Sequence, residues 1–294
     1  MAKTAWVFPG QGSQSVGMGM DLMEHPTGKA RLAIADDILG WSVKDICQSE
    51  DEKVSSTLYT QSCLYVLESL LVDLLREHGH EPDLVAGHSL GEYGALYAAG
   101  AYDFGAGLRL VKLRSELMSQ SSDGIMAALM GFDREALEAK IAATEGVVLA
   151  NDNNPGQVVI SGTAEAVETV IDSVKSKRAM KLNVSGAFHS PLMAPAAREF
   201  QAVLDAVEFR DAAMPVLSNV DPTPATDGPL LKQRLSQQMT GSVRWREIAL
   251  TLPEQGIEQV VEVGPGKVLT GLIKRTVKTL TLTNVGTLEQ LTAL

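Results

Sequence analysis

Residues 84–94 read LVAGHSLGEYG, a short apolar run that leads into a serine with a glycine two positions to either side. The pattern G-x-S-x-G, between a predicted strand and a predicted helix, is typical of a sharp turn that exposes a nucleophilic serine. Gly87 and Gly91 fit such a turn because backbone segments approach closely there. The stretch also fits an ordinary helix start, with Ser89 and Glu92 as a capping box. The strand–turn–helix context favours the nucleophile.

A serine hydroxyl needs a general base, and histidine suits this role near neutral pH. Of the five histidines, His189 follows an apolar segment and precedes Pro191, in an irregular stretch of the kind where site residues collect. His88 adjoins the serine at the turn, so its side chain should point elsewhere, toward packing or substrate. We predict His189 as the base, with a structural histidine as the alternative.

Arg114 lies on a predicted helix, AGLRLVKLRSELM (106–118), with only apolar residues three and four positions away. A guanidinium on an apolar helix face is costly to bury without a partner. One solution is a buried salt bridge. The other is a bidentate clamp on the carboxylate of a ligand, which the planar fork of arginine fits well.

Strands and helices alternate along most of the chain, which predicts an open parallel sheet with helices on both faces. Between residues 125 and 186 the order becomes strand-helix-strand-strand-helix-strand, typical of a ferredoxin-like βαββαβ unit. Within it we expect a helix over 163–177 and a last strand over 179–186. The predicted organisation is a core of residues 1–123 and 188–294, with an inserted subdomain of residues 124–187.

Composition excludes several classes of protein. The formal net charge of the 294 residues is −11, which argues against nucleic acid as a partner. We expect no apolar stretch to approach the roughly 18 residues that cross a bilayer, and we expect no signal peptide at the N-terminus. Cys47 and Cys63 have no metal-ligand spacing, so we expect two buried thiols in a reducing compartment.

Several segments together resemble the malonyl-CoA:acyl-carrier-protein transacylases, the acyltransferases of fatty acid synthesis with relatives in polyketide synthases. The resemblance covers almost the whole chain and includes Arg114. Its other segments are FPGQGSQ (8–14), GHSLGE (87–92), GAFHS (186–190), QMTGSVRW (238–245) and EVGPGKVL (262–269). It implies an α/β-hydrolase-like core that carries the ferredoxin-like subdomain.

The resemblance also implies a ping-pong reaction. Ser89 would attack the malonyl thioester, with His189 as base and then acid, and the malonyl group would pass to the phosphopantetheine thiol of acyl carrier protein. Main-chain N–H groups of Gln11 and Leu90 would form the oxyanion hole. Arg114 would hold the free carboxylate of malonate.

Further roles follow from the same resemblance. A main-chain carbonyl would orient the catalytic histidine, and we map it to Gln238, although the adjacent Gln237 leaves the register open. Phe188 matches the form associated with malonyl over methylmalonyl groups, because a bulky ring leaves no room for a branch; core packing is the alternative. His88 would contact the substrate.

Two basic segments could dock an acidic carrier protein: KSKRAMK (175–181) and LIKRTVK (272–278). The docking residues would be Lys177, Arg178, Lys274 and Arg275, with ordinary solvated charges as the alternative. Neither a metal nor a cofactor is expected, nor a membrane or nucleic-acid partner, and the substrates would be malonyl-CoA and the carrier. A cytoplasmic location is expected, or the plastid stroma where a transit peptide has been removed.

Two rival functions share these features. A thioesterase would use the same serine but pass the acyl group to water, and Arg114 argues for an acyl group that bears a carboxylate. A non-catalytic carrier-binding module would not need the serine hydroxyl at all.

Overall fold

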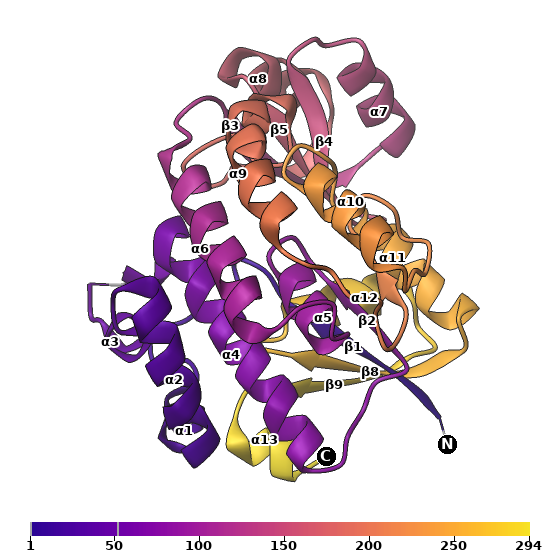
Figure 1. The fold of residues 1–294 in the computed structure, drawn as a ribbon. Coiled ribbons are helices and arrows are strands. Elements are labelled where there is room, and N and C mark those ends of the chain that lie inside the picture. The colour runs from indigo at the N-terminus through magenta and orange to yellow at the C-terminus, as the bar shows by residue number, and fades with distance from the viewer. Residues whose placement is uncertain (1, 52) are drawn as a thin grey trace.

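The carboxyl ends of five parallel strands form the platform on which the serine turn lies. This arrangement is seen in a computed structural model that describes residues 2–51 and 53–294 (Figure 1). The strand order is β7-β2-β1-β8-β9. The strands are β1 (Lys3–Phe8), β2 (Leu84–Gly87), β7 (Val216–Leu217), β8 (Ile257–Val263) and β9 (Thr281–Val285).

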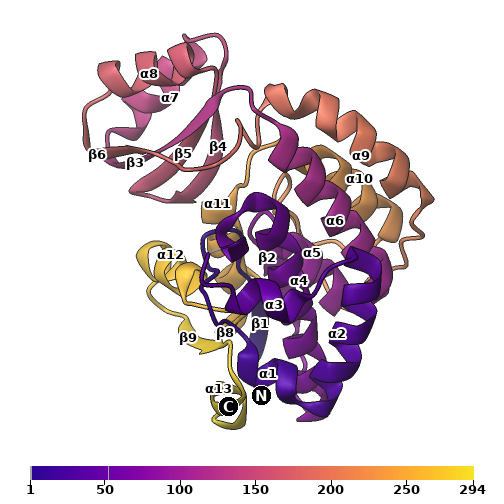
Figure 2. The same cartoon turned by 90° about the vertical axis from the view of Figure 1, so that its left-hand side faces the viewer.

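Helices cover both faces of this sheet, as the alternating side chains of β1 require. Trp6 and Phe8 join the core formed with α4 and α5, whereas Ala5 and Val7 pack in a second core with α11 and α12. Figure 2 shows α12 and α4–α6 on opposite sides of the sheet. The helices of this part are α1 (Met20–Glu24), α2 (Pro26–Leu39), α3 (Val43–Gln48), α4 (Thr57–Glu77), α5 (Gly91–Ala98), α6 (Phe104–Gln120), α9 (Ala194–Ala206), α10 (Gly228–Gln238), α11 (Trp245–Glu254), α12 (Val268–Thr276) and α13 (Leu288–Thr292).

Helix α4 corrects one expectation from composition. Its 21 residues are long and apolar enough to cross a membrane, although no such stretch was expected. However, 83% of its most apolar window is buried inside the protein, where it packs against α5 and α6. It is therefore the central core helix of the fold.

A second, antiparallel sheet lies above the first, with strand order β4-β5-β3-β6. Its elements are β3 (Ile125–Phe132), α7 (Arg134–Ala142), β4 (Val147–Asn154), β5 (Gln157–Gly162), α8 (Ala164–Ser173) and β6 (Ser176–Lys181). Ala127 and Leu129 of β3 pack under the two helices, and Met126 and Ala128 face the larger part. One face of the small sheet is thus available to cover the serine turn.

The end of this unit differs from the expected helix over 163–177 and strand over 179–186. Helix α8 ends at Ser173 because Val174 is already extended, and β6 begins at Ser176. The register against β3 explains the shift: Ser176 pairs with Phe132 and Lys181 with Ala127, so the chain beyond 183 has passed the start of β3.

The small sheet is joined to the larger part through main-chain hydrogen bonds. Val243 pairs with Asn151 of β4; its N–H donates to Ala150 and its carbonyl accepts from Asp152. The Asp152 carboxylate also accepts from Arg246 on α11 at 2.8 Å. The segment before α11 is therefore fixed against β4.

Candidate active site

Ser89 occupies a strained turn between β2 and α5. Its φ is 52°, in the left-handed region that non-glycine residues rarely adopt. A Cβ on Gly87 would lie 1.9 Å from Gly91 carbonyl atoms, and a Cβ on Gly91 would lie 1.9 Å from the Phe8 carbonyl oxygen. Only glycines therefore permit the turn, which presents the serine at the carboxyl edge of the sheet.

The capping-box alternative does not describe this serine. No side chain caps α5, and the Ser89 hydroxyl instead lies 2.8 Å from His189 Nε2. The Glu92 side chain is fully buried and accepts from the Asn219 N–H and from Gln238 Nε2, rather than from the Ser89 N–H. The serine side chain is thus directed toward a base.

His189 is held by two main-chain carbonyls. Its Nδ1 lies 2.9 Å from the Gln238 oxygen and 3.2 Å from the Gly241 oxygen. Because a carbonyl can only accept, Nδ1 carries the proton, and Nε2 is free to accept from Ser89. Gln237 gives its carbonyl to the Gly241 N–H, so the geometry favours Gln238 over Gln237 as the contact.

Burial and the positive charge of Arg114 lower the pKa of His189 to about 3. The imidazole is 3% exposed, so its charged form is poorly solvated. The unliganded site therefore holds a neutral histidine, which is the form that can accept a proton.

Arg114 is a buried cation with neutral partners. Its guanidinium donates to Gln61 Oε1 at 2.6 Å, to Ser89 Oγ at 3.0 Å and to Gln238 Oε1 at 3.2 Å. It is 1% exposed, and burial lowers its pKa. It forms no ion pair with any carboxylate in the described part of the chain, which removes the salt-bridge alternative and leaves a charge ready for an anionic ligand.

Two residues of the same cavity wall, Gln11 and Leu90, have main-chain N–H groups without a partner in the described chain. The Gln11 side chain is fixed by a 3.1 Å bond to Thr57, and a Cβ on Gly10 would lie 2.4 Å from the His88 carbonyl oxygen. The loop after β1 is thus packed tightly against the serine turn.

A cavity of about 200 Å³ connects these groups between the two sheets. Ser89, His189 and Arg114 lie in its wall. Phe188, which is 5% exposed, forms part of its apolar lining and also joins the core, so it takes part in both packing and the cavity. The cavity is also lined by Gln11, Leu90, Met118, Met126, Asn153 and Leu272.

His88 is turned away from the serine hydroxyl. Its Nε2 lies 2.9 Å from Asn153 Oδ1, and its ring packs edge-on against Trp245 at 5.5 Å. Burial lowers its pKa. His88 lies in the cavity wall, which is consistent with contact to a substrate. Of His88 and His189, only His189 reaches the Ser89 hydroxyl.

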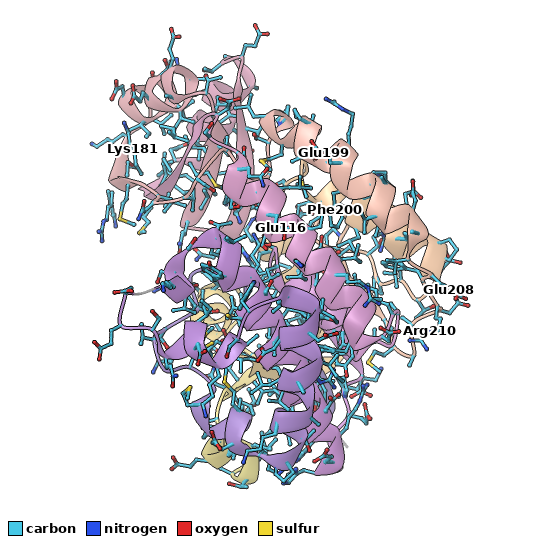
Figure 3. The ribbon with its side chains drawn as sticks, turned by 60° about the vertical axis from the view of Figure 1, so that its left-hand side comes forward. Glu116, Lys181, Glu199, Phe200, Glu208 and Arg210 are labelled. Carbon is cyan, nitrogen blue, oxygen red and sulfur yellow. The ribbon has the colours of Figure 1, made fainter. Side chains whose placement is uncertain are left out.

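The basic residues expected to dock a partner lie outside the cavity. Lys177 and Arg178 are exposed on β6, the outer strand of the small sheet in Figure 2, and Lys181 at its end is labelled in Figure 3. Lys274 and Arg275 are exposed in the last turn of α12. Leu272 of that helix lines the cavity, so α12 runs from the site to the surface.

The sequence did not predict the roles of three polar residues of the site, of which Glu92 was considered only as part of a capping box. Gln61 holds Arg114, Glu92 holds Gln238, and Asn219 contacts the serine turn. Gln61 is a buried amide within an apolar helix, and Asn219 lies two residues after the strand Val216–Leu217, at the sheet edge where ligands bind. An amide within an apolar helix and an asparagine just after a strand were the sequence features that could have indicated Gln61 and Asn219.

Both cysteines, Cys47 and Cys63, are free and buried, as expected. The residues that the structure describes contain no group of three or more His, Cys, Asp or Glu side chains able to hold a metal ion.

Residues 5–292 match the family model described as the acyl transferase domain. The chain is 56% identical to a malonyl CoA-acyl carrier protein transacylase of Synechocystis, over 99% of this chain and all of that one. The crystal structure of the Synechocystis enzyme superposes with a TM-score of 0.97 and covers the same shares.

Two further relatives come from polyketide synthesis. The chain is 44% identical to a Bacillus subtilis polyketide malonyl CoA-acyl carrier protein transacylase, PksC, over 92% of this chain and 96% of that one. A malonyl-transacylase solved in complex with the type II polyketide acyl-carrier protein AntF is 38% identical, with a TM-score of 0.94 over 99% of this chain and 98% of that one.

Because the pKa of His189 is low, we predict that the rate of acylation of Ser89 stays nearly constant as the pH falls below neutral. With an uncharged ester such as p-nitrophenyl acetate, kcat/KM should change less than about twofold between pH 7.5 and 5.5, because the imidazole stays neutral in the free protein. A histidine with an ordinary pKa would lose about tenfold over this range. Ser89→Ala supplies the background rate, and a tenfold loss that depends on Ser89 would contradict the prediction.

Proposed function

The chain belongs to the acyl transferase family of malonyl-CoA:acyl carrier protein transacylases, and from this we propose how its residues transfer a malonyl group. The observation that carries the proposal is that Ser89 Oγ lies within hydrogen-bond distance of both His189 Nε2 and the buried Arg114. One group can act as the base, and the other can hold the far end of a dicarboxylic acyl chain. The product, malonyl-carrier, is the extender unit for fatty acid synthesis.

In the first half-reaction, Ser89 Oγ attacks the thioester carbonyl of malonyl-CoA while His189 Nε2 takes its proton. The negative charge on the tetrahedral oxygen is stabilised by the N–H groups of Gln11 and Leu90, which have no acceptor in the described part of the chain. The C–S bond then breaks, and the imidazolium gives the proton to the CoA thiolate. Malonyl-Ser89 and free CoA result.

The second half-reaction runs the same steps with a different thiol. The phosphopantetheine sulfur of acyl carrier protein gives its proton to His189 and attacks the malonyl ester. When the C–O bond breaks, Ser89 recovers that proton from His189. The protein needs no cofactor for either step, because the phosphopantetheine arrives with the carrier.

We assign the selectivity for malonyl to Arg114 and Phe188. A carboxylate replaces neutral partners at a guanidinium that has no anion in the described chain, so malonyl gains a charge-assisted bond that acetyl lacks. The Phe188 ring fills the space that a methyl branch would need, although one methyl group contributes only about 1–3 kcal/mol to selectivity.

We also infer the finer description of the fold. The strand order β4-β5-β3-β6 with two helices on one face supports a ferredoxin-like subdomain, which we assign to residues 124–187. The parallel sheet with the serine turn after β2 supports an α/β-hydrolase-like core of residues 1–123 and 188–294. A cytoplasmic or plastid-stromal location fits the two free thiols.

The experiment that tests this function mixes the protein with malonyl-CoA and follows its intact mass. A malonyl adduct should form on the wild type and not on Ser89→Ala, and acyl carrier protein should then remove it as malonyl-carrier. A non-catalytic module would give no adduct. A thioesterase would release free malonate even when the carrier is present. His189→Ala should slow adduct formation at least about 100-fold.

Arg114→Ala should reverse the selectivity between acyl groups. Loading from malonyl-CoA should fall about 100-fold or more, because the carboxylate would enter a buried site without its cation. Loading from acetyl-CoA should change much less. The measurement is the ratio of kcat/KM for the two donors, and a preserved malonyl preference would refute the assignment of Arg114.

We propose that β6 and the end of α12 bind the carrier protein, through Lys177, Arg178, Lys274 and Arg275. Their exposure on two elements beside the cavity supports this, as does the need of a chain with net charge −11 for local cations when its partner is acidic. Lys274→Glu with Arg275→Glu should raise the KM for the carrier and leave loading from malonyl-CoA unchanged. An unchanged carrier KM would exclude α12 from the interface.

A further inference from the structure

Asn219 lies behind the serine turn and binds it at two points. Its Nδ2 donates to the Gly87 carbonyl oxygen at 2.5 Å, and its Oδ1 accepts from the Ser89 N–H at 2.7 Å. The two bonds join peptide groups on either side of His88, so one carboxamide spans the turn. Asn219 is fully buried, and 130 residues separate it from Ser89 in the chain.

The Asn219 backbone is itself fixed from both sides. Its N–H donates to Glu92 Oε2 at 3.2 Å, and its carbonyl accepts from the Arg244 N–H at 3.0 Å. It lies two residues after β7, a strand of only two residues at the edge of the sheet. The side chain is therefore placed by tertiary contacts before any substrate arrives.

The turn needs such support because its backbone is strained. A non-glycine residue at positive φ is energetically unfavourable and persists only where its surroundings fix it. Asn219 satisfies the Ser89 N–H, and Gln238 Nε2 satisfies the Ser89 carbonyl at 2.8 Å. Both polar groups of the strained residue are thus bonded to side chains from other parts of the fold.

The N–H groups of the successive residues Ser89 and Leu90 therefore differ in whether they have an acceptor. The N–H of Ser89 is engaged by Asn219, whereas the N–H of Leu90, one residue further, has no acceptor in the described chain and belongs to a residue of the cavity wall. A turn that relaxed toward ordinary φ would rotate the peptide between Ser89 and Leu90. The hydroxyl and the oxyanion donor would then lose their alignment together.

We propose that Asn219 is a positioning residue for acylation of Ser89, a role that rests on the proposed transfer function. It does not touch the acyl group. It holds the Gly87–Leu90 backbone so that the hydroxyl faces His189 and the Leu90 N–H faces the developing oxyanion. Substrate affinity and malonyl selectivity depend on other residues, Arg114 above all, and should not depend on Asn219.

The test is single-turnover loading from malonyl-CoA, followed by quenched-flow and intact mass. Asn219→Ala should lower the maximal loading rate about 100-fold, the loss expected for a misplaced reacting group. The half-saturating malonyl-CoA concentration should stay within about threefold, and so should the malonyl-to-acetyl preference, because Arg114 keeps its contacts with Gln61 and Gln238.

Asn284→Ala is the matched control. The Asn284 amide also makes two donor contacts, to Glu262 and Thr270, at the end of another strand of the same sheet. It should load at close to the wild-type rate.

A second variant, Asn219→Asp, keeps the side-chain volume and the acceptor for the Ser89 N–H but loses the donor to the Gly87 carbonyl. It should load malonyl at least about tenfold more slowly than the wild type. This variant decides the question if Asn219→Ala does not fold.

Loading by the folded Asn219 variants within threefold of Asn284→Ala would overturn the proposal. A wild type that gains no adduct would instead refute the transfer function itself, so the two failures are distinguishable.

A second measurement separates positioning from general stability. Ser89→Gly relieves the positive φ and should raise Tm by about 2–4 °C in the wild-type background. In the Asn219→Ala background the turn has already relaxed, so the same change should raise Tm by less than about 1 °C. An equal gain in both backgrounds would show that Asn219 does not maintain the strained turn.

Discussion

The site depends on a constraint on the backbone: Ser89 and His189 are both held at positive φ, at 52° and 56°. In the described part of the chain no other non-glycine residue has such a φ. These two residues are the ones whose side chains meet, at 2.8 Å across 100 residues of sequence. Strain at both ends of this hydrogen bond indicates that the fold stabilises reactive geometry at the expense of local conformational energy.

The segment from Gln238 to Arg244 holds both Ser89 and His189 in place. Gln238 and Gly241 give their carbonyls to His189, the Gln238 side chain binds the Ser89 carbonyl, and Val243 pairs with β4 of the small sheet. The same short stretch therefore fixes His189, the turn that bears Ser89 and the strand β4 of the small sheet. This explains why a histidine can be oriented here without a carboxylate partner.

The sequence predicted the local features of the site well, because each had a local cause. Gly87 and Gly91 indicated the turn because a Cβ at either position would clash with nearby backbone. Arg114 indicated a site because a charged side chain is unusual on an apolar helix face. Asn219 and Gln61 could not be assigned roles, since their importance comes from contacts 130 and 53 residues away. The boundary between α8 and β6 was misplaced for a related reason: pairing with β3, rather than local propensity, decides where the strand begins.

Arg114 and His189 are coupled through charge as well as through Ser89. After burial, the positive charge of Arg114 is the largest cause of the low pKa of His189. A carboxylate bound to Arg114 cancels part of that charge, so the pKa of His189 rises when an acyl group with a free carboxylate enters, and the imidazole becomes a stronger base. An acyl group without a carboxylate leaves the charge in place and the base weak. In the mechanism proposed above, the guanidinium therefore contributes to selectivity twice, by binding the dicarboxylic substrate and by making proton transfer from Ser89 easier only when that substrate is bound.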